Sequence, residues 1–157
     1  MNPTQAESLR TIILPQANAA LGTLHDGQPF VSMVPFAVMP DGKGFVIHVS
    51  GLAAHTKDML AHPTVSLLVM APQSPDVPPQ ALPRVTVQCE ARKIDDDHAF
   101  YAAARTAYLQ RFPEAEMMMA LGDFSFFVLA PLAVRLVGGF AQAASLTPLN
   151  LEQALAG

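Results

Sequence analysis

The chain has 157 residues, of which 51% are hydrophobic, and this length and composition predict one domain with a hydrophobic core. Its formal net charge of −4 and its scattered Lys and Arg residues argue against a nucleic-acid partner. Charged residues make up only 14%, below the typical ~25%, so we expect a second copy of the chain, rather than a membrane, to cover part of the surface.

Cysteine content and the first residues of the chain bear on its compartment. Cys89 is the only cysteine, so neither an internal disulfide nor a thiolate metal cage can form. Residues 1–7 lack the basic and apolar parts of an export signal, and the apolar run at 124–134 is shorter than the ~20 residues that span a bilayer. We expect a cytoplasmic protein with no membrane segment and no metal site.

The first third of the chain predicts a helix followed by an antiparallel meander. An Asp-Gly pair within residues 25–29 and two glycines within residues 40–44 indicate tight turns between apolar runs. In chain order we predict a helix at 4–14 and strands at 19–24, 30–39 and 45–50.

The remainder predicts more strands with helices set between and after them. Residues 72–83 contain five prolines and predict an extended loop on the surface or across a partner subunit. We predict strands at 65–71, 84–94, 122–129 and 133–137, and helices at 58–62, 99–111, 114–121 and within 146–156, with residues 95–97 capping the helix at 99–111. Because crossover helices do not follow the strands regularly, the pattern predicts a mainly β barrel with flanking helices.

Residues 50–57 form the most informative segment, because they gather polar groups where a helix begins. Ser50, His55, Thr56 and Lys57 supply two hydroxyls, an imidazole and an ammonium. Unpaired N–H groups at a helix start favour anions, so this corner is a candidate phosphate site. The alternative is a solvated helix start in which Thr56 acts as a cap.

Four segments resemble the FMN-binding split-barrel superfamily related to pyridoxamine 5′-phosphate oxidase. The resemblance covers residues 17–143, and the last segment, with His55-Thr56, is most similar to the branch that includes haem-utilisation proteins. The segments are residues 21–24 with 30–37, 49–60, 62–68 and 135–140.

The resemblance implies a six-stranded antiparallel split β-barrel. Residues 1–157 would form a single domain, with the barrel at 17–143 and a tail at 144–157. It also implies a homodimer with FMN at the subunit interface, and an oxidoreductase acting on an unidentified small molecule. The alternative is a non-catalytic dimer that binds flavin or haem as carrier, sensor or store. Haem or a deazaflavin could also replace FMN in the same cleft.

The resemblance further implies a set of cofactor-binding residues, although no residue stands out as catalytic. The flavin ring would lie along residues 32–35 and the phosphate at the corner. Arg84 is either another ligand or a strand-edge charge, and His48 either contacts the flavin or packs. The full set is Ser32, Met33, Val34, Pro35, His48, Val49, Ser50, His55, Thr56, Lys57 and Arg84.

Two departures from the family limit the activities that we expect. The vitamin B6 oxidase has an Arg-Lys pair at the corner and a Trp near its C-terminus, whereas this chain has Ala54-His55 or His55-Thr56 there and no Trp. Oxidation of pyridoxamine phosphate is therefore not expected. Haem-degrading members bind iron through a histidine in a C-terminal extension, and His98 is the last histidine here. Any haem would need another ligand.

Overall fold

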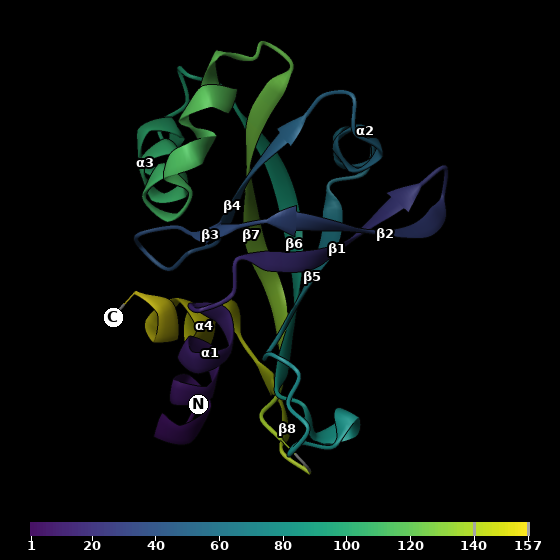
Figure 1. Ribbon diagram of the computed structural model, residues 1–157, viewed down its shortest axis with the longest axis vertical. Coiled ribbons are helices and arrows are strands. Elements are labelled where there is room, and N and C mark those ends of the chain that lie inside the picture. Colours follow the sequence, from purple (N-terminus) through teal and green to yellow (C-terminus); the bar gives the residue numbers. More distant parts are fainter. Residues whose placement is uncertain (140, 157) are drawn as a thin grey trace.

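The computed structural model describes residues 1–139 and 141–156, so Phe140, where the last resembling segment ends, lies outside the described residues. The described part contains one antiparallel sheet of eight strands in the order β2-β1-β5-β6-β7-β4-β3, with β8 paired to β7 (Figure 1). The strands are β1 (Asn18–His25), β2 (Gln28–Pro35), β3 (Ala37–Val38), β4 (Phe45–Ser50), β5 (Thr64–Met70), β6 (Arg84–Ile94), β7 (Phe124–Val137) and β8 (Ala143–Leu146).

The expected mainly β split barrel is confirmed, but it has eight strands, whereas the sequence pattern predicts seven and the resemblance implies six. The strand expected at 30–39 divides at Phe36, whose side chain is buried and whose N–H donates to the Ala17 carbonyl (3.0 Å). The two strands expected at 122–129 and 133–137 are one strand, β7, which continues through Pro131 opposite an irregularity in β6 at Gln88 and Cys89. Strand β8 follows Gly138 and Gly139 and was not predicted.

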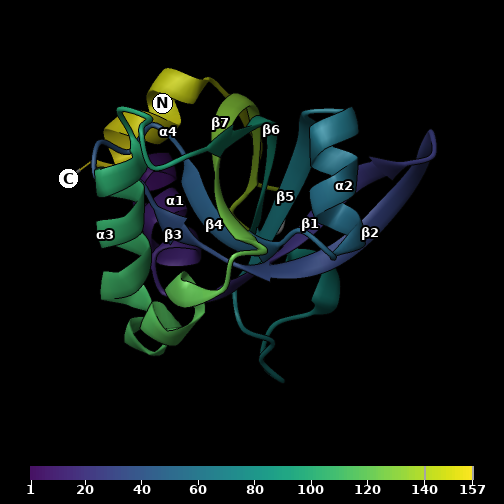
Figure 2. The same cartoon turned by 90° about the horizontal axis from the view of Figure 1, so that it is seen from above.

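The helices lie around the sheet at three places. In Figure 1, α2 lies near the β1–β2 hairpin and α3 near β4, while Figure 2 shows these two helices on opposite sides of the curved sheet. Helices α1 and α4 lie side by side near the two chain ends. The helices are α1 (Pro3–Ile13), α2 (Ala54–Ala61), α3 (Tyr101–Arg111) and α4 (Pro148–Leu155), with 3₁₀ segments η1 (Pro79–Ala81) and η2 (Pro113–Ala120).

Two details of the helices differ from expectation. Helix α2 begins at Ala54, four residues before the predicted start, so His55, Thr56 and Lys57 belong to its first turn. Helix α3 begins at Tyr101 after Phe100, and no side chain caps it, so the expected cap at residues 95–97 is wrong. No helix within the described ranges combines the length and apolar character needed to cross a membrane.

Two hydrophobic clusters hold the sheet and helices together. The larger fills the inside of the sheet and includes residues of α1 and α4, such as Leu9, Ile13 and Leu151. The smaller lies between the other face of β4 and β7 and helix α3, where Phe126 and Tyr108 pack. Strand β4 separates the clusters, because alternate side chains point to opposite faces. Phe45, Ile47 and Val49 belong to the larger cluster, and Val46 belongs to the smaller one.

The β1–β2 hairpin extends beyond the rest of the sheet and positions one wall of the candidate site. It turns at Asp26 and Gly27, whose φ angles of 50° and 76° fit the Asp-Gly turn expected from the sequence. Strand β2 is an edge strand. Its residues Val31 and Met33 are 68% and 61% exposed, whereas Ser32, between them, points to the opposite face.

Candidate functional site

The corner between β4 and α2 is closed by hydrogen bonds to Ser50. The Ser50 carbonyl accepts from the Ala53 N–H (3.1 Å) and from the Thr56 hydroxyl (2.6 Å), and the Ser50 hydroxyl accepts from the Leu52 N–H (3.1 Å). Ala53 occupies the N-cap position, and no side chain caps the helix. The N–H groups of the first turn of α2 are therefore left to solvent or a ligand.

Helix α2 is joined to the β1–β2 hairpin by three side-chain hydrogen bonds. His55 Nδ1 lies 3.0 Å from the Ser32 hydroxyl of β2. Asp58 accepts from the Thr23 hydroxyl and from His25 Nδ1 of β1, both at 2.7 Å. His55 and Asp58 are three residues apart and so lie on one face of the helix.

Asp58 is a buried carboxylate, 5% exposed, and its hydrogen bonds keep it ionised. Burial alone would raise its pKa, but the hydrogen bonds from Thr23 and His25, with the charges of His25 and His55, lower the pKa below its ordinary value. The same contacts act on His25 in the opposite sense. The hydrogen bond to Asp58, then the charges of Asp58 and Asp26, raise the pKa of His25 despite some loss of solvation.

His55 differs from His25 because it is held in its neutral form. Burial lowers the pKa of His55, and this effect exceeds the opposing effect of the nearby Asp58 charge. Its Nδ1 contacts Ser32, and Nε2 makes no hydrogen bond to any described residue. A neutral imidazole with one ring nitrogen held and the other available is suited to bind a metal ion or to accept a proton.

The charges at the corner are mixed rather than simply positive. Lys57 is exposed and supplies one ammonium. The Ser50 hydroxyl donates to the carboxylate of Asp123 (2.8 Å), which therefore lies beside the corner, and Asp58 lies one turn further along α2. One protomer thus offers a single fixed cation and two carboxylates to an anion bound here.

The predicted site residues do not all come together. Ser32, Ser50, His55, Thr56 and Lys57 gather at the corner, although Thr56 is buried and its hydroxyl is used to close the corner. Met33 and Pro35 follow on β2, where Met33 points away from His55. Their binding roles stay predictions.

Val34 and Val49 require a correction, because their side chains lie inside the larger hydrophobic cluster. They are 1% and 4% exposed. Their inclusion in the cofactor-binding set is therefore wrong for their side chains. In this protomer, only the backbone of either residue could take part in a site.

His48 lies on the α3 side of the sheet rather than at the corner, surrounded by aromatic rings. Its ring centroid is 4.4 Å from that of Phe126, 5.3 Å from Phe124 and 5.8 Å from Tyr108. Burial lowers its pKa, so the ring is neutral. It lines a cavity of about 300 Å³ with Asp95, Tyr101 and Ser125. These contacts favour the interpretation that the His48 ring packs against the protein, and a contact of His48 with a bound cofactor stays a prediction.

Arg84 lies far from the corner of its own protomer. It pairs with Val137 at one end of β7, whereas Ser50 pairs with Phe124 at the other end. A strand of 14 residues extends for roughly 45 Å at ~3.3 Å per residue. The guanidinium donates to the carbonyls of Gln80 (3.3 Å) and Leu82 (2.9 Å). Any contribution of Arg84 to a corner would have to come from a partner subunit.

Sequence reasoning missed Thr23, His25, Asp58 and Asp123, which complete the corner. Asp58 follows Lys57 on an otherwise weakly patterned helix, and no local signal links it to β1. The sequence offered one indirect signal for Asp58. In a helix, a carboxylate three residues after His55 lies on the same face as His55. The described residues contain no group of three or more His, Cys, Asp or Glu side chains that could hold a metal ion. Burial raises the pKa of Cys89 to about 12, so this thiol is unreactive.

Three of the proteins to which the chain is similar are named for haem. The chain is 37% identical over 140 residues to "Non-canonical heme oxygenase HOZ, chloroplastic" of Arabidopsis thaliana, covering 87% of this chain and 41% of that protein. It is 27% identical over 118 residues to "Heme oxygenase HutZ" of Vibrio cholerae, covering 74% of this chain and 66% of that protein. A solved heme binding protein from Mycobacterium smegmatis superposes with a TM-score of 0.85 at 32% identity, covering 98% of this chain and 62% of that one.

The chain therefore spans about two fifths of the plant relative and less than two thirds of the other two. The family model described as "Pyridoxamine 5'-phosphate oxidase" matches residues 6–138, which include every strand from β1 to β7 and the corner. The split barrel, the corner and this match together show that the chain belongs to the pyridoxamine 5′-phosphate oxidase family.

Proposed function

We propose that this protein binds haem as a homodimer, with the haem at the corner between β4 and α2 and close to the β1–β2 hairpin. The observation that carries the proposal is the similarity to three proteins named for haem, one of them 37% identical over 87% of this chain. Bound haem supplies a redox-active iron, and the residues of this chain position it and its carboxylates.

His55 is the residue of the corner best suited to bind the iron. Its imidazole is neutral, its Nδ1 is oriented by Ser32, and its Nε2 has no partner among the described residues. An imidazole in this state can bind iron without first losing a proton. His25 is less suited, because Asp58 favours its protonated form.

The charges at the corner do not by themselves distinguish haem from FMN. The phosphate of FMN carries close to two negative charges, whereas the corner of one protomer offers Lys57 alone as a fixed cation and places Asp123 beside Ser50. Haem carries two propionates with one charge each, and the single exposed ammonium of Lys57 can pair with one of them. The exposed side chain of Leu52, just before α2, adds apolar surface next to the corner.

A second copy of the chain would complete this site. Strand β2 is an open edge, and Val31 and Met33 expose apolar side chains on its outer face. The low charge content of the chain also fits a surface that is covered in the assembly. We propose that Arg84 of the partner subunit adds a second cation to the corner, because Arg84 lies too far from the corner of its own protomer.

FMN remains the second candidate for the same corner. The family model and the uncapped first turn of α2 favour it, because helix N–H groups bind phosphate well. In that case the protein would be an FMN-dependent oxidoreductase acting on a small molecule that the sequence does not identify.

Parallel titrations of the purified chain with haemin and with FMN test these proposals. We expect haemin to give a saturable Soret band with one haem per subunit, and FMN to bind at least tenfold more weakly. Light scattering on the same sample should give the mass of a dimer. Tighter binding of FMN than of haemin would reject the main proposal in favour of the second, and a monomer would reject the shared site.

Variants of two histidines locate the iron ligand. His55→Ala should change the Soret maximum and the electron paramagnetic resonance spectrum of the bound iron, because the axial ligand is lost. The matched control is His62→Ala, since His62 lies exposed just after the same helix and should leave both spectra unchanged. If His48→Ala alone changes the spectra, the haem lies on the α3 side and His55 is not the ligand.

A further inference from the structure

We propose that a pocket between α1, β3 and α3 binds a small carboxylic acid with an apolar body. This site is distinct from the corner. It has a volume of about 330 Å³ and lies where the two hydrophobic clusters meet, since Ile13 and Phe36 belong to the larger cluster and Ala37 to the smaller. Nothing in the proposed haem site uses it.

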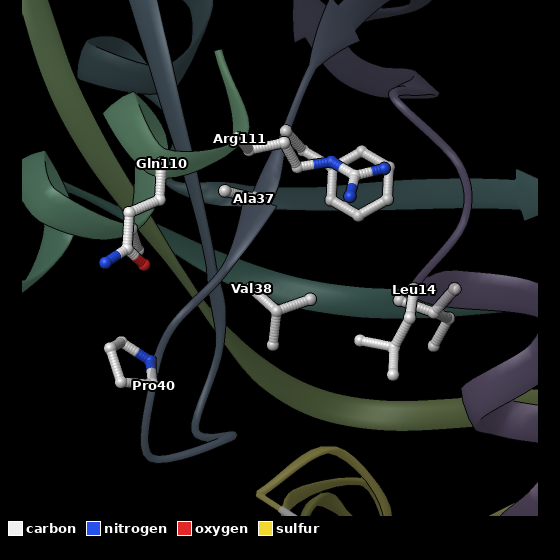
Figure 3. A pocket seen from close by; sticks show the side chains of 9 residues that line it. Leu14, Ala37, Val38, Pro40, Gln110 and Arg111 are labelled. Carbon is white, nitrogen blue, oxygen red and sulfur yellow. The ribbon is translucent and has the colours of Figure 1, made fainter. Parts of the chain in front are cut away.

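The pocket combines an apolar wall with two polar side chains from one helix. Figure 3 shows Gln110 and Arg111 reaching from α3, with Val38 near the centre of the view, Leu14 on the right and Pro40 below Gln110. Leu14 caps the end of α1, and Val38 belongs to β3. Three separate elements therefore form one mainly apolar concave surface that carries two polar side chains, which is the arrangement of a small-molecule site.

Arg111 has a donor that the described residues do not satisfy. Its guanidinium carries five N–H bonds in a planar fork. Nη2 donates to the Gln16 carbonyl, and the group lies 5.9 Å from the centre of the Phe112 ring. Nε is buried and has no hydrogen-bond partner among the described residues. Buried donors in native proteins are nearly always paired, so an unpaired guanidinium N–H beside a cavity indicates a missing acceptor.

The charge of Arg111 points to the same class of ligand. Arg10, Arg92 and Arg105 each lie within 3.0 Å of a glutamate, whereas no carboxylate in the described part of the chain lies within salt-bridge distance of Arg111. A carboxylate fits a guanidinium because it can accept two of its N–H groups at once. The side chains of Leu14, Val38 and Phe36 would then cover the apolar body of the ligand.

Hexanoate is a suitable probe. Hexan-1-ol has the same hydrocarbon chain without the charge, and inorganic phosphate has negative charge without an apolar body, so these two serve as comparators. The measurement is a titration of the full chain followed by methyl NMR signals of Leu14 and Val38. We expect hexanoate to shift both signals saturably, hexan-1-ol to bind at least tenfold more weakly, and phosphate to leave both signals unchanged. Equal affinity for hexanoate and hexan-1-ol, or hexanoate shifts confined to other residues, would overturn the proposal.

Two variants of α3 separate the charge of Arg111 from its structural bond to Gln16. Arg111→Gln should weaken hexanoate binding at least tenfold, and Arg105→Gln on the same helix should leave it unchanged. Ala107→Leu keeps Arg111 but places a larger side chain in the pocket, so it should abolish binding in a folded protein. If Arg111→Gln does not fold, Ala107→Leu decides the matter, and wild-type affinity in either folded variant overturns the site.

Discussion

The two helices that flank the barrel, α2 and α3, are attached to the sheet in different ways. Helix α3 packs through a continuous set of apolar and aromatic side chains, including Ala104 and Tyr108, against Phe126 of β7. Helix α2 buries Met59 but makes its other specific contacts through polar side chains, those of His55, Thr56 and Asp58.

This difference separates a region built for stability from one whose state depends on ionisation and ligands. Apolar contacts between α3 and the sheet do not vary with pH. The hydrogen bonds of α2 involve two histidines and a buried carboxylate, whose pKa values are shifted in different directions. We therefore expect substitutions on the α3 side to change mainly the free energy of unfolding, and substitutions on the α2 side to change it less and in a pH-dependent way.

The largest effect is expected for Phe126→Ala. The Phe126 ring is 2% exposed and contacts the rings of His48, Tyr101 and Tyr108, so its removal leaves a cavity between the sheet and α3. We expect a loss of about 3–5 kcal/mol in the free energy of unfolding, measured by urea denaturation.

The matched control for this substitution is Phe100→Ala, because Phe100 precedes the same helix but is 50% exposed. It should cost less than about 1 kcal/mol. Similar losses for the two variants would show that α3 is not held by the smaller hydrophobic cluster.

Much of the fold could be predicted because its signals are local. The Asp-Gly turn at residues 26–27 predicted the β1–β2 hairpin, and the helix predicted at residues 4–14 is α1, Pro3–Ile13. The errors also have physical causes. The division between β2 and β3 depends on a hydrogen bond from Phe36 to Ala17, and the continuity of β7 through Pro131 depends on an irregularity in the neighbouring strand β6. These are contacts between distant segments, which a local pattern does not carry.

The candidate site was less predictable for the same reason. Residues 50–57 showed a helix start with polar side chains, and the structure brings His55 and Lys57 to that start. The contact of His25 with Asp58 joins residues 33 positions apart, so composition and spacing could not reveal it. Alternate residues of a strand point to opposite faces, but the sequence does not show which face is buried. The structure shows that Val34 and Val49 point into the core and not toward a ligand.

A smaller effect is expected for Thr56→Val, which tests how the corner is closed. The buried Thr56 hydroxyl donates to the Ser50 carbonyl, and valine keeps the shape of the side chain but cannot donate. We expect a loss of about 1 kcal/mol in the free energy of unfolding. Thr11→Val is the control, since the Thr11 hydroxyl in α1 is exposed and water can replace its bonds. If Thr11→Val lowers the free energy of unfolding as much as Thr56→Val does, the hydrogen bond from Thr56 to Ser50 does not stabilise the corner specifically.

The smallest effect on the free energy of unfolding is expected from loss of the His25–Asp58 contact, because water reaches the His25 ring. This effect can be recognised because it depends on pH. The folded-state pKa of His25 is raised above 6.5, so its contribution to stability is complete below pH 6.5 and is lost as the pH rises through the raised value. The pKa of Asp58 is lowered below 3.8, so its contribution is present above pH 3.8 and is lost as the pH falls through the lowered value. The two act together between these limits.

His25→Gln should therefore reduce the free energy of unfolding between pH 3.8 and 6.5 and make little difference in alkaline solution, above the raised pKa of His25. Urea denaturation at several pH values measures this difference, and an NMR titration of the His25 ring in Asp58→Asn should show its pKa falling back toward 6.5. His62→Gln, exposed after the same helix, should show no such pH dependence. If His25→Gln costs the same stability at every pH, the imidazole serves only as a neutral hydrogen-bond donor, and the attachment of α2 does not depend on ionisation as its contacts indicate.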